Sequence, residues 1–108
     1  MSEVFGLDQL LARRLQVGKS YLEFLRVPAI SAGIYVLSKG ANDPQQPHTE
    51  DEIYYVINGK AKIRIGAEVR SVGEGSVIFV DAGVEHRFLD IEQDLVVLVV
   101  FGPAESTP

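Results

Sequence analysis

Hydrophobic and polar residues follow two different periods along the chain. Between residues 7 and 15 (LDQLLARRL) the leucines recur at the spacing of one helical face. This pattern predicts a short amphipathic helix that packs against the rest of the domain and ends at Gly18. From Ser20 onward, stretches rich in Val, Ile, Tyr and Phe alternate with turn residues, a pattern typical of an all-β sandwich or barrel. We expect strands near residues 20–27, 31–38, 52–58, 60–65, 68–72, 76–80, 85–91 and 94–101.

The dipeptide Asn58-Gly59 separates two of these expected strands. Both central residues of a type I′ turn need a positive φ, which Asn and Gly tolerate better than other residues. The dipeptide therefore predicts a two-residue hairpin between residues 52–58 and 60–65. Four further glycines indicate turns later in the chain, namely Gly66, Gly73, Gly75 and Gly83.

Residues 95–101 (LVVLVVF) are apolar on both faces of a strand, whereas a strand with one solvated face would alternate. We expect one face to line the interior of the barrel. The other face needs a cover, and we predict that a second subunit provides it in a homodimer. The alternative is that the N-terminal helix covers this face within one chain.

Length and composition restrict the possible partners. The 108 residues predict a single domain, with a helical segment at 1–18 and a β-barrel at 19–102. The net charge is −5 and the ten Lys and Arg are scattered, which disfavours a nucleic-acid partner. We find no apolar run long enough for a membrane span and no targeting pattern at the N-terminus, so we expect a cytoplasmic protein. The absence of cysteine excludes disulfides, zinc–thiolate sites and thiol nucleophiles.

The two histidines of the chain lie in two turn-rich segments that each lead into an expected strand. His48 precedes Glu52, which shares a strand face with Tyr54, and His86 opens a later strand. If both strands belong to one small barrel, His48, Glu52 and His86 converge on its interior. Two imidazoles and a carboxylate match the set that binds divalent iron and leaves coordination positions open. The alternative is that both histidines are ordinary residues at the mouth of an apolar barrel.

The same two segments resemble the paired motifs of the cupin superfamily. The spacing of the first motif is met by Gly40, Gln46, His48, Glu52 and Gly59, and that of the second by Gly75, Asp81, Gly83, His86 and Asp90. The resemblance implies a jelly-roll β-barrel that holds one divalent metal ion, such as Fe, Mn, Zn or Ni. Its ligands would be His48, Glu52 and His86.

Three positions depart from the motifs. Gln46 stands where cupins usually have their first ligand histidine, and it either coordinates the metal, holds a metal-bound water or takes no part. Asp81 replaces a proline, and Asp90 replaces an asparagine. Asp90 is a candidate acceptor behind a ligand.

The resemblance alone does not fix a reaction, because this fold serves dioxygenases, isomerases, decarboxylases, lyases and binders. We expect a metal-dependent enzyme that acts on a small oxygenated organic molecule chelated in the barrel. Tyr54 is the candidate catalytic base. The alternative is a non-catalytic module that binds or senses a small molecule with the same metal, and a third possibility is a barrel that holds no metal.

Overall fold

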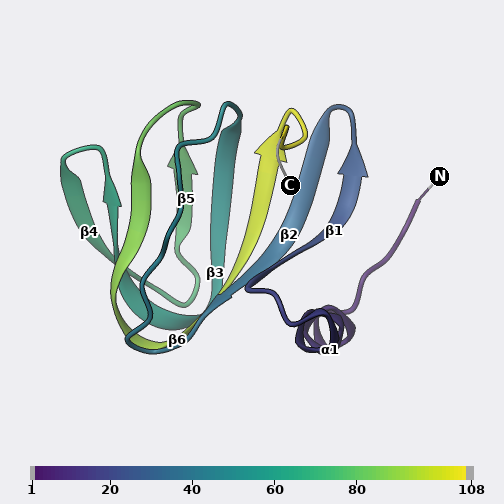
Figure 1. Cartoon of the computed structure of the whole chain (residues 1–108), viewed down its shortest axis with the longest axis horizontal. Helices are drawn as coiled ribbons and strands as arrows, with labels where there is room; N and C mark the ends of the chain where they lie inside the picture. The colour runs from purple at the N-terminus through teal and green to yellow at the C-terminus, as the bar shows by residue number, and fades with distance from the viewer. Residues whose placement is uncertain (1, 107–108) are drawn as a thin grey trace.

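A computed structural model describes residues 2–106, which contain one helix and six antiparallel strands (Figure 1). The predicted all-β class with one short N-terminal helix is confirmed. The helix α1 spans Leu7–Val17, and Gly18 ends it in the left-handed conformation, as predicted. The strands are β1 (Tyr21–Val27), β2 (Ile30–Leu37), β3 (Asp51–Ile65), β4 (Glu68–Gly73), β5 (Val77–Val80) and β6 (His86–Gly102).

The two long strands β3 and β6 organise the sheet. The strand order is β1-β2-β6-β3-β4, and β5 pairs with β3 away from this path. The first part of β3 pairs with β5 and its second part with β4, while β6 runs beside both parts. Because β3 and β6 bend together, the sheet curls around an interior (Figure 1).

The predicted hairpin at Asn58-Gly59 is wrong, because β3 continues through both residues. Gly59 does have the positive φ that the dipeptide suggested, at 108°. Gly59 lies at a bend of β3, where the β3–β6 register shifts. A Cβ added there would lie only 2.5 Å from the backbone oxygen of Asp94, so the close approach of the strands requires glycine. The actual hairpin follows at Gly66, where Ile65 pairs with Glu68 across a two-residue turn.

The strands expected at 85–91 and 94–101 are likewise one strand, β6. The β3–β6 register shifts again in this region, and Asp90 is the only non-glycine residue among those described that has a positive φ, at 47°. A residue in this conformation lets a long strand bend without ending.

The core fills the interior of the curled sheet, near the bends of β3 and β6. The alternation in β3 places Tyr54 and Val56 inside with no exposed surface, while Ile53 and Tyr55 face outward. In β6 the predicted inward row of residues 95–101 is buried. Apolar members of the core with 2% exposure or less include Tyr54, Val56, Ile63, Phe88, Leu95, Val97 and Val99.

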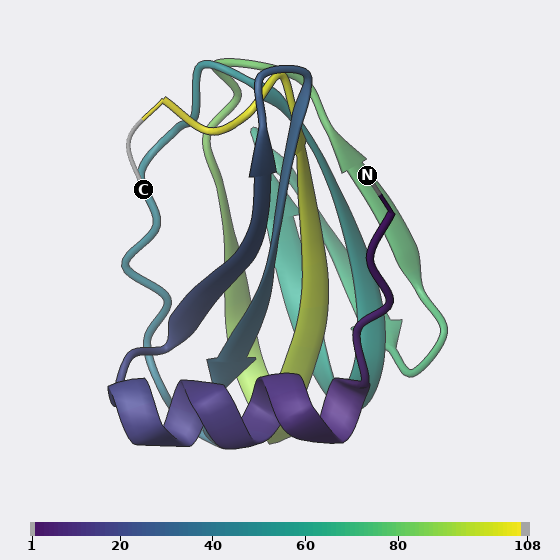
Figure 2. The ribbon, with the colours of Figure 1, turned by 90° about the vertical axis from the view of Figure 1, so that its right-hand side faces the viewer.

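The helix α1 covers only one side of the outer face. It contacts β1 and β2 and buries Leu10 there (Figure 2). The outward residues of β3 and β5 stay open to solvent, at 42–69% exposure. They form two cross-strand pairs, Ile53 with Phe79 and Tyr55 with Val77.

Candidate metal centre

Three separate segments bring His48, Glu52 and His86 to one point. Glu52 is the second residue of β3 and points inward with 2% of its surface exposed. His86 is the first residue of β6 and is as deeply buried. His48 lies in the loop before β3, and its backbone oxygen accepts a hydrogen bond of 2.6 Å from the backbone N–H of Gly83. This bond ties the loop to the turn that precedes β6.

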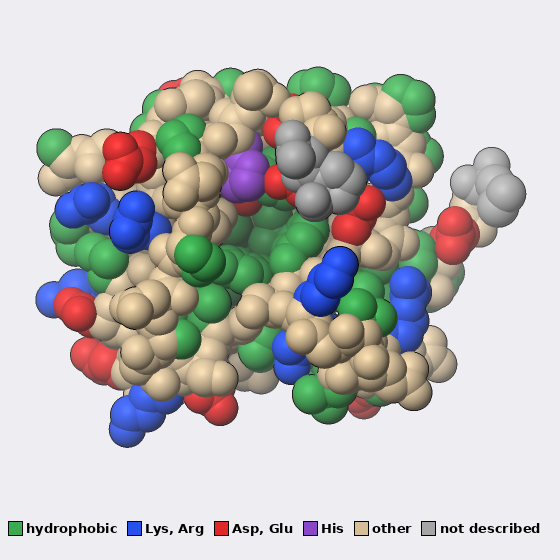
Figure 3. Space-filling model, in the orientation of Figure 1, with side chains coloured by type: hydrophobic (Ala, Val, Ile, Leu, Met, Phe, Trp, Pro, Cys, Tyr) green, Lys and Arg blue, Asp and Glu red, His purple; other side chains and the backbone are tan. Residues whose placement is uncertain are grey.

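The three side chains are close enough to share one ion. One ligand atom of each lies within 4.8 Å of the other two. His86 Nε2 is 3.0 Å from Glu52 Oε1, and the two imidazole rings are 5.4 Å apart between centroids. A histidine lies at the edge of a hollow floored by hydrophobic side chains (Figure 3).

Some of the polar atoms at this point lack hydrogen bonds. His48 Nε2 and Glu52 Oε2 are buried without a hydrogen-bond partner among the described residues, and Glu52 Oε1 is buried with only its contact to His86 Nε2. Leaving such atoms unpaired in a barrel interior costs free energy, and a divalent cation bound between them would remove that cost. Two neutral imidazoles and one carboxylate are a ligand set for divalent transition metals. The residues present therefore fit a divalent ion.

The outer nitrogen of each ring has its own acceptor. His86 Nδ1 lies 2.9 Å from the backbone oxygen of Val84, and His48 Nδ1 lies 3.0 Å from Glu105 Oε2. An acceptor at Nδ1 favours the tautomer that is protonated there, which leaves Nε2 free to bind a metal. Burial lowers the pKa of His86, but the Glu52 carboxylate and the Val84 carbonyl outweigh it, and the net shift is upward.

The structure does not bring Gln46 to this cluster. Gln46 is exposed on the outer side of the loop, and Gln45 reaches into the site instead. Gln45 Oε1 accepts a hydrogen bond of 2.6 Å from the Tyr54 hydroxyl and lies 3.2 Å from His86 Nε2. The motif spacing pointed to residue 46, but the loop geometry presents the amide of its neighbour.

Buried Asp43 fixes the orientation of this amide. Its carboxylate accepts hydrogen bonds of 2.6 Å from Gln45 Nε2 and from the Tyr35 hydroxyl, and one of 2.8 Å from the backbone N–H of Phe88. Because the amide nitrogen faces Asp43, the amide oxygen must face His86 and Tyr54. Sequence reasoning missed Asp43, because nothing distinguishes one aspartate in a polar loop.

Tyr54 lies at the site as predicted from its alternation with Glu52. Its hydroxyl is 3.1 Å from His86 Nε2. Burial raises its pKa well above the ordinary value, and the Glu52 carboxylate adds to the shift. Tyr54 therefore keeps its proton in the metal-free site and acts as a hydrogen-bond donor there.

Asp90 does not support a ligand as hypothesised. Its side chain is exposed and lies 3.8 Å from Lys62 Nζ, on the outside of the sheet. The buried carboxylates that do contact site residues are Asp43 and Glu105, one before and one after the two predicted ligand histidines.

A cavity of about 200 Å³ adjoins the cluster. No Lys or Arg of the described chain lines it, and the Tyr21 hydroxyl beside it is buried without a hydrogen-bond partner there. Burial raises the pKa of Tyr21, and the charge of Glu105 adds to this, so the hydroxyl remains a donor. The lining residues are Tyr21, Tyr35, Pro44, Gln45, His48, Glu52, Tyr54, Val99, Phe101 and Glu105.

Comparisons with known proteins agree with this geometry. The family model described as Cupin domain matches residues 33–101. The chain therefore belongs to the cupin family, and the predicted jelly-roll fold is confirmed. The chain is 48% identical to an uncharacterized protein of Streptomyces coelicolor over 104 residues, which cover 96% of this chain and 99% of that protein.

Solved structures share the fold at lower identity. The TT1209 protein of Thermus thermophilus is similar with a TM-score of 0.73 and 22% identity, over 95% of this chain and 99% of that one. An RmlC-like cupin of Shewanella frigidimarina gives a TM-score of 0.71 and 19% identity, over 78% of this chain and 75% of that one. At these identities the likeness concerns the fold.

The only helix of residues 2–106 is too short to span a bilayer.

Proposed function

We propose that this cupin is a metal-dependent enzyme, of the dioxygenase, isomerase or lyase type, that acts on a small oxygenated molecule bound in the barrel. One observation supports this proposal above the others. One ligand atom each of His48, Glu52 and His86 lies within 4.8 Å of the other two, beside a cavity, and His48 Nε2 and Glu52 Oε2 are buried without a hydrogen-bond partner in the described chain. A barrel built only for stability would gain nothing from this arrangement.

The side chains of the site have separate tasks in this proposal. His48, Glu52 and His86 would hold the ion. A bound divalent ion would supply Lewis-acid polarisation of a substrate oxygen or, for a redox metal, electron transfer. Tyr54 keeps its proton and orients Gln45, and the Tyr21 hydroxyl is placed to donate to a substrate oxygen.

The cavity favours a small neutral substrate. Its volume of about 200 Å³ is below the about 300–1,000 Å³ of pockets that hold drug-sized ligands. Its described lining has no Lys or Arg to pair with a phosphate or sulfate, and it includes the carboxylates of Glu52 and Glu105. Its aromatic and aliphatic walls suit a flat apolar body with oxygen atoms directed at the ion.

A panel of small keto, enediol and phenolic compounds tests this function with untagged protein loaded with Fe(II), Mn(II), Ni(II) or Zn(II). Turnover only under air would indicate a dioxygenase, and turnover under both air and nitrogen an isomerase or lyase. His86→Ala is the matched control and should turn over nothing. If no compound of this class binds to the loaded protein, the proposal is wrong.

A non-catalytic binding or sensing module is the second candidate. This candidate is favoured because two of the tyrosine hydroxyls that line the cavity are already hydrogen-bonded. Tyr35 is bonded to Asp43 and Tyr54 to Gln45, so neither hydroxyl stands free as an acid or base. Binding of panel compounds without turnover under either atmosphere would favour this module over the enzyme.

We also propose that two chains pair through the exposed outer face of β3 and β5. This face continues the outward row of β6 and displays Ile53, Tyr55, Val77 and Phe79. Light scattering after size exclusion should give a dimer for the natural chain and a monomer for Phe79→Lys. Val69→Lys, at an exposed position on β4, is the control and should stay dimeric. A monomeric natural chain would refute the pairing.

A further inference from the structure

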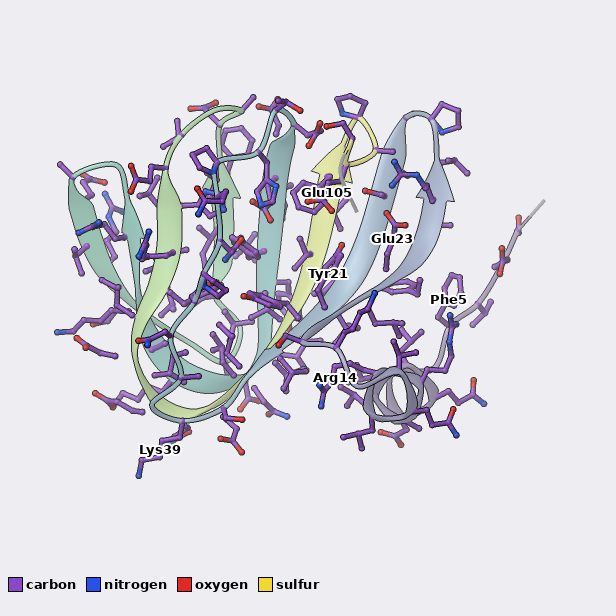
Figure 4. All side chains as sticks on the ribbon, in the orientation of Figure 1. Phe5, Arg14, Tyr21, Glu23, Lys39 and Glu105 are labelled. Atoms are coloured by element: carbon purple, nitrogen blue, oxygen red, sulfur yellow. The ribbon has the colours of Figure 1, made fainter. Side chains whose placement is uncertain are left out.

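The segment after β6 folds back over the barrel mouth and inserts the Glu105 side chain. Glu105 is 6% exposed and lines the cavity beside the metal cluster. In Figure 4, Glu105 and Tyr21 lie near each other beside β6 and β2. Within residues 2–106, the only basic side chain at salt-bridge distance from the Glu105 carboxylate is His48, at 3.0 Å.

The backbone of this segment is held from two sides. On one side, the Glu105 N–H donates 2.9 Å to Ser31 Oγ, and the Arg26 guanidinium donates to the Glu105 backbone oxygen. On the other side, the Ser106 N–H donates 3.3 Å to Glu50 Oε2. Anchors on β1, on β2 and on the loop that bears His48 fix the carboxylate in place.

Burying a carboxylate at this position of a metal-free barrel costs free energy. The Glu105 side chain is buried, and it shares the lining of the cavity with the carboxylate of Glu52. An apolar side chain would fill the same space without that cost. The position therefore suggests a task that needs an acceptor beside His48.

The His48 ring lies between the inner cavity and a groove on the outside of the barrel mouth, so an acceptor can fix its orientation. His48 and Glu105 are the two residues that line both the inner cavity and an outer groove of about 310 Å³. In the described chain, the only ring within aromatic contact of His48 besides His86 is Phe101, 4.8 Å away between centroids. Removal of Glu105 would take away the acceptor at His48 Nδ1 and one side chain of the wall between the ring and the groove.

We propose that Glu105 is a positioning residue of the metal centre, which holds the His48 ring with Nδ1 protonated and Nε2 directed at Glu52 and His86. This inference rests on the proposed metal site but assigns it a fourth protein group, supplied by the chain segment after the last strand. Carboxylates that support a ligating histidine in this way typically change metal affinity by about 10–100-fold when removed.

A metal-free measurement tests the positioning directly. The chain has only two histidines, so two-bond ¹H–¹⁵N spectra of untagged protein contain just two imidazole patterns. We expect the Nδ1–H tautomer for the His48 ring in the natural protein. Glu105→Ala should change the pattern of His48 and leave that of His86. If the His48 pattern is unchanged, the proposal is refuted, whether or not the protein binds metal.

Zinc affinity, measured by competition with a chelator, is the second readout. Glu105→Ala should weaken Zn²⁺ binding by about 10–100-fold, and Glu105→Gln, which keeps size and an acceptor oxygen, by less. Glu92→Gln is the control, because Glu92 is exposed and pairs with Lys60 on the outside. Equal affinities for Glu105→Ala and the natural protein would overturn the proposal, as would an effect on unfolding alone. Failure of the natural protein itself to bind Zn²⁺ would count against the proposed function, and the tautomer experiment would still decide the role of Glu105.

Discussion

The two ends of the barrel interior are built from the same strands, but one end buries apolar side chains and the other buries polar ones. Near the bends of β3 and β6, the interior is closed by apolar residues such as Val56, Ile63 and Leu95. At the mouth, the same two strands present Glu52 and His86, which are equally buried. The apolar end gains free energy from burial. The mouth buries polar atoms at a cost in free energy that a bound ion would offset. One end of the interior therefore stabilises the fold, and the other is the candidate metal centre.

Leu95→Ala should have the largest effect, and only on the folding end. Leu95 has no exposed surface, so truncation leaves a cavity and should lower the free energy of unfolding by about 2–5 kcal/mol. Urea unfolding in the presence of a chelator measures this. Zn²⁺ affinity, measured where the variant is folded, should stay within about threefold of the natural value, since Leu95 lies outside the ligand set. A large loss of affinity would show that the two ends are not separable.

His86→Ala should show the reverse pattern. Removal of one of three ligands should weaken Zn²⁺ binding by more than about 100-fold, which corresponds to about 3 kcal/mol. Unfolding in chelator should change less than for Leu95→Ala. Glu85→Gln, at an exposed neighbouring position, is the control and should bind like the natural protein. Undiminished zinc affinity in His86→Ala would remove His86 from the site.

Gln45→Ala and Gln46→Ala compare two adjacent amides on the mouth loop. Gln45 is held by Asp43 and contacts His86, so its loss should weaken Zn²⁺ binding by about tenfold. Gln46 is exposed, and its loss should leave affinity unchanged. The opposite order would mean that the motif spacing identifies the relevant amide and the loop conformation does not.

A change in pH should act on the mouth of the barrel. Glu105 has a pKa of about 7 in the folded protein against an ordinary 4.5, so the stability it contributes is present below about 4.5 and lost as the pH rises to about 7. The raised pKa of His86 acts in the same direction. Metal competes with protons for the imidazoles, so zinc-bound protein should gain relative to metal-free protein as the pH rises.

Urea unfolding with Zn²⁺ and with chelator, from about pH 5 to about pH 8, measures this difference. The gap in the free energy of unfolding between the two conditions should widen with pH. A gap that narrows over this range would contradict the assignment of histidines as ligands.

Local patterns predicted much of the fold, and nonlocal contacts account for the errors. The helix, its end at Gly18 and the alternation in β3 depend on nearby residues and were predicted. The dipeptide Asn58-Gly59 signals a positive φ, but the sequence does not say whether that φ serves a turn or a bend. In the structure, contact with β6 decides for the bend.

The residues of the candidate site also fall into those that the sequence predicts and those that it does not. His48, Glu52 and His86 were predicted because strand alternation and motif spacing point to them. Gln45, Asp43 and Glu105 were missed because their roles depend on loop paths and on partners remote in sequence. Glu105 contacts His48 from the far end of the chain, and no periodic pattern links the two positions.

His48, Glu52 and His86 are proposed to hold one divalent ion together. Metal analysis of untagged protein, loaded in turn with Mn(II), Fe(II), Ni(II) and Zn(II) and then desalted, tests this proposal most directly. We predict about one equivalent per chain of at least one of these ions in the natural protein, and almost none in His86→Ala. Natural protein that retains none of the four ions would contradict the account.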